Sequence, residues 1–159
     1  MSNGNKYEAT KNLDIAVIAQ LVRDDIKAAL ADGTLLKGTK CGVRISRFAG
    51  GRSMRITIKA FAGQVWTDEF IGSDPRRCFE GERRTAIAQS TVHVLERILR
   101  AYNYDNSDIM TDYFDVRFYS SVEFDHAVSI ADRAATEARL NGLVDLSLTD
   151  MAMAAAANF

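Results

Sequence analysis

The fold of this chain is constrained most by two alternating segments that flank a Gly-Gly pair. Apolar residues recur at every second position on both sides of Gly50-Gly51, namely Cys41, Val43, Ile45, Met54, Ile56 and Ile58. This period predicts a β-hairpin with one apolar face. With the two glycines in the turn, Ile45 lies opposite Ile56, and Arg44 lies opposite Thr57. The apolar face needs a cover, so the hairpin is the centre of the predicted fold.

Two helices and further strands are predicted around the hairpin. Apolar residues at three- and four-residue steps predict helices over 13–32 and 82–102. Alternation predicts a strand over 113–119, and a short strand with a loop is expected within 61–81. This order is typical of a two-layer α+β domain over 13–125. Its predicted sheet is antiparallel and built on the hairpin, with helices packed on one face.

The two ends of the chain are predicted to lie outside that domain. Residues 1–12 are polar and lack an apolar period, so they are expected to form a flexible tail. Residues 126–159 are predicted to form an Ala-rich helical extension, with a helix stop at Asn141-Gly142. This extension is a candidate interface for a homodimer, and a frayed end is the alternative.

Composition excludes several classes of protein. The 159 residues are 47% apolar and 26% charged, as in globular domains, and no apolar run is long enough to span a membrane. The N-terminus lacks a secretory signal, and two cysteines cannot form a disulfide framework. We therefore expect a cytoplasmic protein with no membrane partner. The formal net charge of −1 excludes a uniformly basic nucleic-acid binder and a wholly acidic DNA mimic.

The near-zero net charge conceals a basic segment over 40–59. This segment has six basic residues and no acidic one, and they are Lys40, Arg44, Arg47, Arg52, Arg55 and Lys59. A cationic ribbon can follow phosphates, because guanidinium groups match the geometry of phosphate oxygens. The alternative is a solvated strand face whose charges pair with a neighbouring strand and protect a sheet edge.

An acidic segment over 104–125 has the opposite charge. Its acidic residues are Asp105, Asp108, Asp112, Asp115, Glu123 and Asp125, against the single cation Arg117. If the strand in this segment turns its apolar side chains inward, Asp115 and Arg117 share the outer face of the sheet. Cross-strand ion pairs with Arg44 and Arg55 are then expected. Display of the acids toward a basic partner is the functional alternative, and a calcium loop is disfavoured because the required glycine is absent.

Arg83 and Arg84 form a second candidate site. They lie in the first turn of the second predicted helix, where the helix dipole disfavours cations. Two guanidinium groups beside free helix amides would make an anion cradle. The alternative is that Glu80 and Glu82 neutralise them.

The sequence offers little support for catalysis. His93 and His126 have no metal-ligand partner at a usual spacing, and neither Cys41 nor Cys78 has a nearby histidine. We predict no catalytic residue, no bound metal and no cofactor.

Two motifs together resemble a known family. The segments VRISRFAGGRSMRITI (43–58) and YNYDNSDIMTDYFDVRFY (102–119) are similar to the twenty-ninth large polyvalent protein-associated domain. The resemblance covers roughly 13–120 and leaves the C-terminal region unexplained. It implies a small α+β module of phages and other mobile elements, acting in the host cytoplasm, and it carries over no catalytic residues.

The combined prediction is a non-enzymatic accessory protein that binds a host protein or nucleoprotein complex and inhibits or modulates host nucleic-acid or defence machinery. The predicted contact residues are Arg44, Arg47, Arg52, Arg55, Lys59, Arg83, Arg84, Tyr113, Asp115, Arg117 and Tyr119. The alternative is direct nucleic-acid binding by the basic hairpin, with Tyr113 and Tyr119 as stacking platforms. A metal-dependent hydrolase built on Asp105, Asp108 and Asp112 is a third, disfavoured hypothesis.

Overall fold

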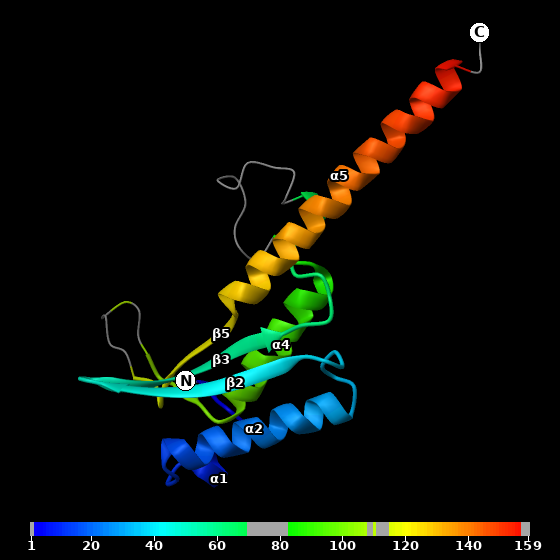
Figure 1. Ribbon diagram of the computed structural model, residues 1–159. Helices are drawn as coiled ribbons and strands as arrows, with labels where there is room; N and C mark the ends of the chain where they lie inside the picture. The colour runs from blue at the N-terminus through cyan, green and yellow to red at the C-terminus, as the bar shows by residue number, and fades with distance from the viewer. Residues whose placement is uncertain (1, 70–82, 108–109, 111–114, 157–159) are drawn as a thin grey trace.

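The chain folds as an α+β domain with helices on one face of a small sheet (Figure 1). The computed structural model describes residues 2–69, 83–107, 110 and 115–156, and beyond residue 142 the description is limited to the backbone. The elements are β1 (Ser2–Asn3), α1 (Tyr7–Thr10), α2 (Ile15–Ala31), β2 (Lys40–Phe48), β3 (Gly51–Ala60), α4 (Ala86–Ala101), β4 (Tyr104–Asp105), β5 (Tyr119–Phe124) and α5 (His126–Ala156). The predicted fold class is confirmed.

The main sheet is mixed, and this corrects the predicted antiparallel arrangement. Its three strands follow the order β2-β3-β5, with β2 and β3 antiparallel and β5 parallel to β3. The physical reason is the connection: between β3 and β5 the chain passes through α4, and a helical crossover returns it to the end of the sheet where β3 began.

The hairpin turn lies one residue earlier than predicted. Phe48 pairs with Gly51, so Ala49 and Gly50 form the turn, and Gly50 takes the positive φ of 93° that favours glycine. Arg44 consequently lies opposite Arg55, where the sequence predicted Thr57. Moving the turn by one residue moves each cross-strand partner by two. Every side chain therefore keeps its predicted face.

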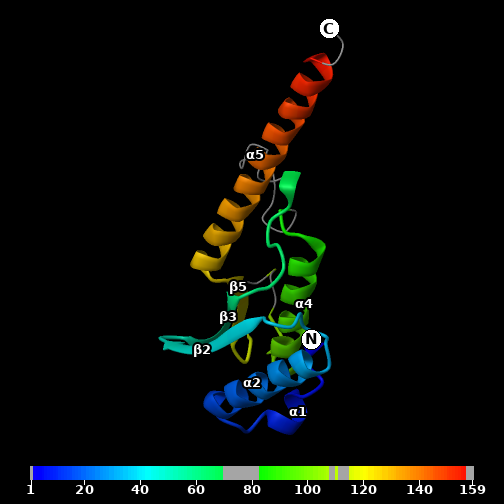
Figure 2. The same cartoon turned by 45° about the vertical axis from the view of Figure 1, so that its right-hand side comes forward.

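The core lies between the sheet and the two longer helices of the domain, α2 and α4, which cover the same face (Figure 2). Fully buried residues come from the sheet and from both helices, and they include Ile18, Val22, Met54, Ile56, Ile58, Leu95 and Leu99. Asp14 caps α2 by accepting a hydrogen bond from the Ala16 amide at 2.8 Å, close to the predicted start. Thr85 caps α4, which begins later than the predicted residue 82.

Residues 2–12 pack on the domain and do not form the predicted tail. β1 pairs with β4, and the Lys6 ammonium forms an ion pair of 2.6 Å with Asp25 of α2. Thr10 is buried and its hydroxyl accepts a hydrogen bond from Arg117. Polar contacts anchor this segment, so its lack of an apolar period does not make it a flexible tail.

Two predicted strands are also corrected. The strand expected over 113–119 begins only at Tyr119, and Val116 forms an isolated bridge with Asp105. Within the described part of 61–81 no strand forms, and Trp66 makes an isolated bridge with Arg84.

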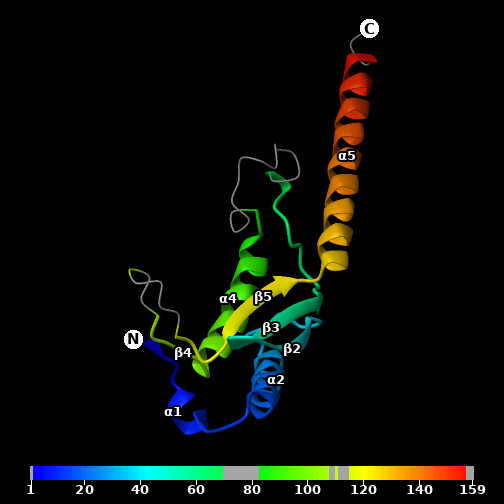
Figure 3. The same ribbon diagram turned by 90° about the vertical axis from the view of Figure 1, so that its left-hand side faces the viewer.

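The C-terminal helix is longer than predicted. α5 continues through Asn141-Gly142, where the sequence indicated a stop, as far as Ala156. A glycine inside a helix costs only about 1 kcal/mol, which favourable neighbours offset. The helix is joined to the domain near its start, where the Trp66 indole N–H donates to the Ser129 carbonyl at 3.1 Å. From there α5 extends away from the sheet (Figure 3).

Candidate functional site

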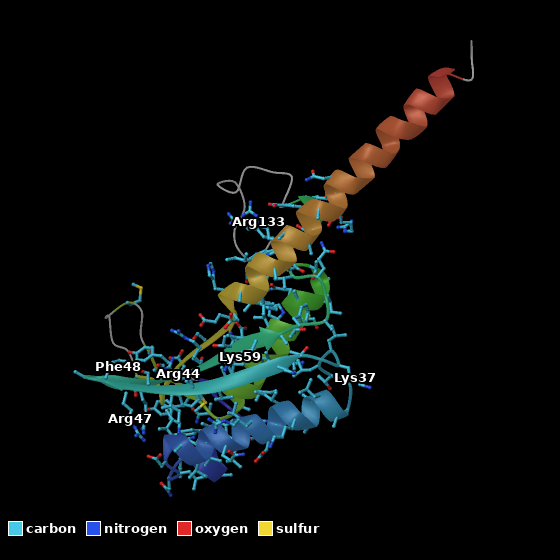
Figure 4. All side chains as sticks on the ribbon, viewed as in Figure 1. Lys37, Arg44, Arg47, Phe48, Lys59 and Arg133 are labelled. Atoms are coloured by element: carbon cyan, nitrogen blue, oxygen red, sulfur yellow. The ribbon has the colours of Figure 1, made fainter. Side chains whose placement is uncertain are left out.

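The face of the sheet opposite α2 and α4 carries the basic residues of the hairpin. We call it the open face and define it by strand alternation and register as Arg44, Ser46, Phe48, Ser53, Arg55, Thr57, Lys59, Tyr119, Ser121 and Glu123. Figure 4 shows Arg44, Phe48 and Lys59 on this side of the ribbon, whereas Arg47 points to the side of α2. The predicted site residues of the hairpin therefore divide between two faces.

Two arginines lie directly opposite each other on the open face. Arg44 of β2 pairs in register with Arg55 of β3, and like charges in this position destabilise a hairpin. Arg55 has a partial partner in Glu123 of β5, at 3.4 Å. Among the residues that the structure describes, no carboxylate lies within ion-pair distance of Arg44. The open face thus displays an uncompensated cation.

An aromatic pair stands at the turn end of the same face. The rings of Phe48 and Tyr119 have centroids 5.9 Å apart and an angle of 35° between their planes. They are 50% and 44% exposed. Tyr119 was predicted as a contact residue. Phe48 was not, although it directly precedes the turn and alternation along β2 puts it on the same face as Arg44.

Lys59 extends the basic surface toward the other end of β3. Its side chain lies over Gly42, since a Cβ at Gly42 would come within 2.8 Å of the Lys59 Cε. The glycine therefore lets the lysine stem lie flat on the strand.

Arg47 and Arg52 make structural contacts on the side of the helices. The Arg47 guanidinium lies 3.3 Å from the Asp14 carboxylate, and the Arg52 Nε donates to the Arg117 carbonyl at 3.1 Å. The Ala16 amide, more than the charge of Arg47, lowers the pKa of Asp14. Both arginines lie beside the site, and neither lies on the open face.

The predicted cross-strand pairs of Asp115 and Arg117 with the hairpin are wrong. Because β5 begins at Tyr119, both residues precede the strand and lie outside the sheet. The Asp115 carboxylate accepts the Tyr104 hydroxyl at 2.7 Å.

Arg117 is a buried structural cation. Its guanidinium donates to the Thr10 hydroxyl at 3.0 Å, to the Tyr102 carbonyl at 2.8 Å and to the Thr10 carbonyl. It also lies over the Tyr7 ring, 5.3 Å from the centroid. Burial lowers the pKa of Arg117. We call this set of contacts the N-terminal clamp, because it fixes residues 7–10 on the domain and leaves Arg117 inaccessible to a partner.

The predicted placement of Arg83 and Arg84 in the first turn of the helix is wrong. Both residues precede Thr85, the cap of α4, so they lie before the helix and not in its first turn. The Arg84 guanidinium lies over the Phe124 ring, 5.7 Å from the centroid. The predicted neighbours Glu80 and Glu82 lie outside the described residues.

Only part of the acidic loop can be placed. Asp105 accepts a hydrogen bond from the Ser107 amide at 2.9 Å, and hydrogen bonding by Ser107 lowers the pKa of Asp105. Asp108, Asp112 and Tyr113 lie outside the described residues. Within the described ranges, no three His, Cys, Asp or Glu side chains gather as metal ligands would.

Among the described residues, neither Cys41 nor His93 hydrogen-bonds to a second side chain that could act in catalysis, and Cys78 lies outside those residues. Burial raises the pKa of the Cys41 thiol to about 11, so at neutral pH it is not a thiolate. His93 is exposed, and its ring shares a hydrogen bond of 3.0 Å with Gln89 one turn earlier.

Comparison with protein-family models, with curated proteins and with solved structures gives no match. None of the described helices has both the length and the apolar character needed to cross a membrane.

Proposed function

We propose that this protein binds nucleic acid through the open face. The observation that carries the proposal is the Arg44–Arg55 pair, two exposed cations held opposite each other at a cost to the hairpin. Sequences rarely keep an unfavourable local arrangement unless it serves a function, so this pair of like charges marks a candidate binding site. Phosphate oxygens placed between the two guanidinium groups would turn this repulsion into attraction.

The charge of the face supports the same partner. The described part of the open face has three cations, Arg44, Arg55 and Lys59, against one carboxylate, Glu123. Since the whole chain has a formal charge of −1, attraction to phosphate is local and the rest of the surface does not add to it. We therefore expect salt-sensitive binding of moderate strength.

An accessory role at host nucleic-acid or defence machinery is the context that the family resemblance implies. In that context the open face would engage the nucleic acid of a nucleoprotein complex. Affinity capture from host lysate, with and without nuclease treatment, tests this extension. Capture that survives nuclease would instead favour direct binding to a host protein.

The proposal is tested by fluorescence anisotropy with labelled single-stranded and duplex oligonucleotides between about 50 and 200 mM salt. We expect Arg44→Gln with Arg55→Gln to weaken binding by about tenfold or more. The slope of log affinity against log salt should become shallower by roughly 0.7 to 0.9 for each phosphate that the variant no longer binds. Lys11→Gln with Lys27→Gln is the matched control, because it removes the same charge from the C-cap of α1 and from α2. Equal losses of affinity in the two variants, or no binding by the unmodified protein, would overturn the proposal.

A further inference from the structure

The aromatic pair of the open face has a specific structural cause at Gly51. A Cβ built on Gly51 would lie 3.2 Å from a ring carbon of Phe48 and 3.2 Å from a ring carbon of Tyr119. The two rings come from β2 and β5 and close together over the middle strand because β3 has no side chain at this position.

The turn does not account for this second glycine. Gly50 supplies the positive φ of the hairpin, whereas the φ of Gly51 is not in the left-handed region. A Cβ at Gly51 would instead force both rings to move by a few tenths of an ångström, so the glycine lets them lie as close together as they do. The chain preserves room for an exposed aromatic surface that contributes little to the core.

We infer that Phe48 and Tyr119 form a stacking platform for the unpaired bases of a single strand, an inference that rests on the proposed function. Half-exposed rings offer π faces on which any base can stack. Bases inside a duplex are already stacked on one another and cannot reach such a platform. A single strand is thus the form of nucleic acid that uses both the cations and the rings.

The dimensions of the face suit such a strand. Arg44 and Phe48 lie four residues apart on β2, which is about 13 Å at the rise of a β-strand. At about 3.4 Å per nucleotide in a stacked strand, this distance corresponds to about four nucleotides. A short single strand can therefore contact the arginines with its phosphates while one or two of its bases lie on the rings.

The half of the open face near the hairpin turn, where the aromatic pair lies, is not covered by the long helix α5. β5 runs parallel to β3 from Tyr119, so α5 leaves the sheet at the end away from the turn. In Figure 1 the helix extends away from the turn, and Figure 4 shows Phe48 at the opposite end of the ribbon from the start of α5.

The test compares a thymidine oligonucleotide of about 16 nucleotides with a duplex of the same length. Phe48→Leu with Tyr119→Leu removes the π faces and keeps every charge. We expect single-strand affinity to fall by about tenfold or more, with an unchanged salt dependence and little change in duplex binding. Gly51→Val, which keeps both rings but separates them, should weaken single-strand binding in the same direction.

Ile87→Ala is the control, because Ile87 is an apolar side chain of α4 with 43% exposure that lies away from the open face. Thermal unfolding followed by circular dichroism checks that each variant is folded. Unchanged single-strand affinity in the Phe48→Leu, Tyr119→Leu variant would overturn the platform while leaving phosphate binding by the arginines intact. Tighter binding of the duplex by the unmodified protein would also overturn it. Absence of binding to either oligonucleotide would reject the proposed function itself.

Discussion

Two arginines of this chain show opposite uses of the same side chain. Arg117 is buried in the N-terminal clamp, where carbonyl and hydroxyl oxygens accept its hydrogen bonds. Arg44 stands on the open face opposite Arg55 and without a carboxylate partner among the described residues. Contacts within the protein therefore satisfy Arg117, whereas Arg44 is available to bind a partner.

The same contrast holds for the two charged segments of the sequence. The acidic segment uses much of its charge locally, since Asp115 and Asp105 accept hydrogen bonds from nearby residues. The basic segment displays Arg44, Arg55 and Lys59 on one sheet face. Among the described residues, the ion pair of 3.4 Å between Arg55 and Glu123 joins the two segments, and most of their other charges do not neutralise each other in the fold.

The largest expected effect is on stability and comes from removing the buried cation, Arg117. Arg117→Met removes the donors of the clamp and leaves buried carbonyl acceptors without partners. We expect the free energy of unfolding to fall by about 3 kcal/mol, measured by urea denaturation. Arg44→Met, the matched change on the open face, should alter it by less than about 0.5 kcal/mol. Similar losses in both variants would contradict the contrast between them.

A second prediction concerns Cys41, on the face of β2 opposite Arg44, whose contribution to stability depends on pH. The folded state holds the Cys41 proton more tightly than the unfolded chain, because burial raises the pKa of the thiol from 9.0 to about 11. Stability contributed by the neutral thiol is therefore complete below pH 9 and lost as the pH rises toward 11. The thiol is only partly buried, so we expect this loss to be about 1 to 2 kcal/mol.

Urea denaturation as a function of pH measures that loss. Lys6 and Tyr102, whose pKa values are also raised, act in the same direction, so the informative quantity is a difference. The decline should be shallower in Cys41→Ala than in the unmodified protein. Parallel declines would show that Cys41 is not shielded by the fold.

The smallest expected effect concerns the carboxylate of the open face. Glu123→Gln removes a weak, exposed ion pair and should change the free energy of unfolding by less than about 0.5 kcal/mol. It should increase affinity for single strands on the order of twofold, because it removes local repulsion of phosphate. Glu96→Gln on α4 is the control, since Glu96 pairs with Arg100 at the same 3.4 Å. An equal gain in both variants would indicate an effect of net charge alone.

Much of the fold was predictable because the alternation of apolar residues fixes which face of a strand each side chain occupies, even when the register of pairing shifts. Alternation identified the hairpin and its apolar face even though the turn lies one residue away from the predicted position. The helices were found from their apolar stripes. The parallel pairing of β5 was missed although the helix predicted between the two strands favours it, because a helical crossover joins parallel strands.

The site was predictable only in part. Arg44, Arg55, Lys59 and Tyr119 were selected from the sequence and lie together on the open face. Phe48 was missed because sequence patterns predict that a strand phenylalanine is buried, whereas here it is 50% exposed. Arg117 was assigned to a surface because its strand was expected to begin earlier, and a strand boundary is what decides whether a side chain belongs to a face.

The central claim is tested most directly by mapping backbone amide chemical shifts while a single-stranded oligonucleotide is added. We predict that the largest shifts fall in β2, β3 and β5 around Arg44, Arg55 and Tyr119, and that they disappear in the Arg44→Gln, Arg55→Gln variant. Shifts concentrated on α2 or α4, or no shifts at all, would contradict binding through the open face.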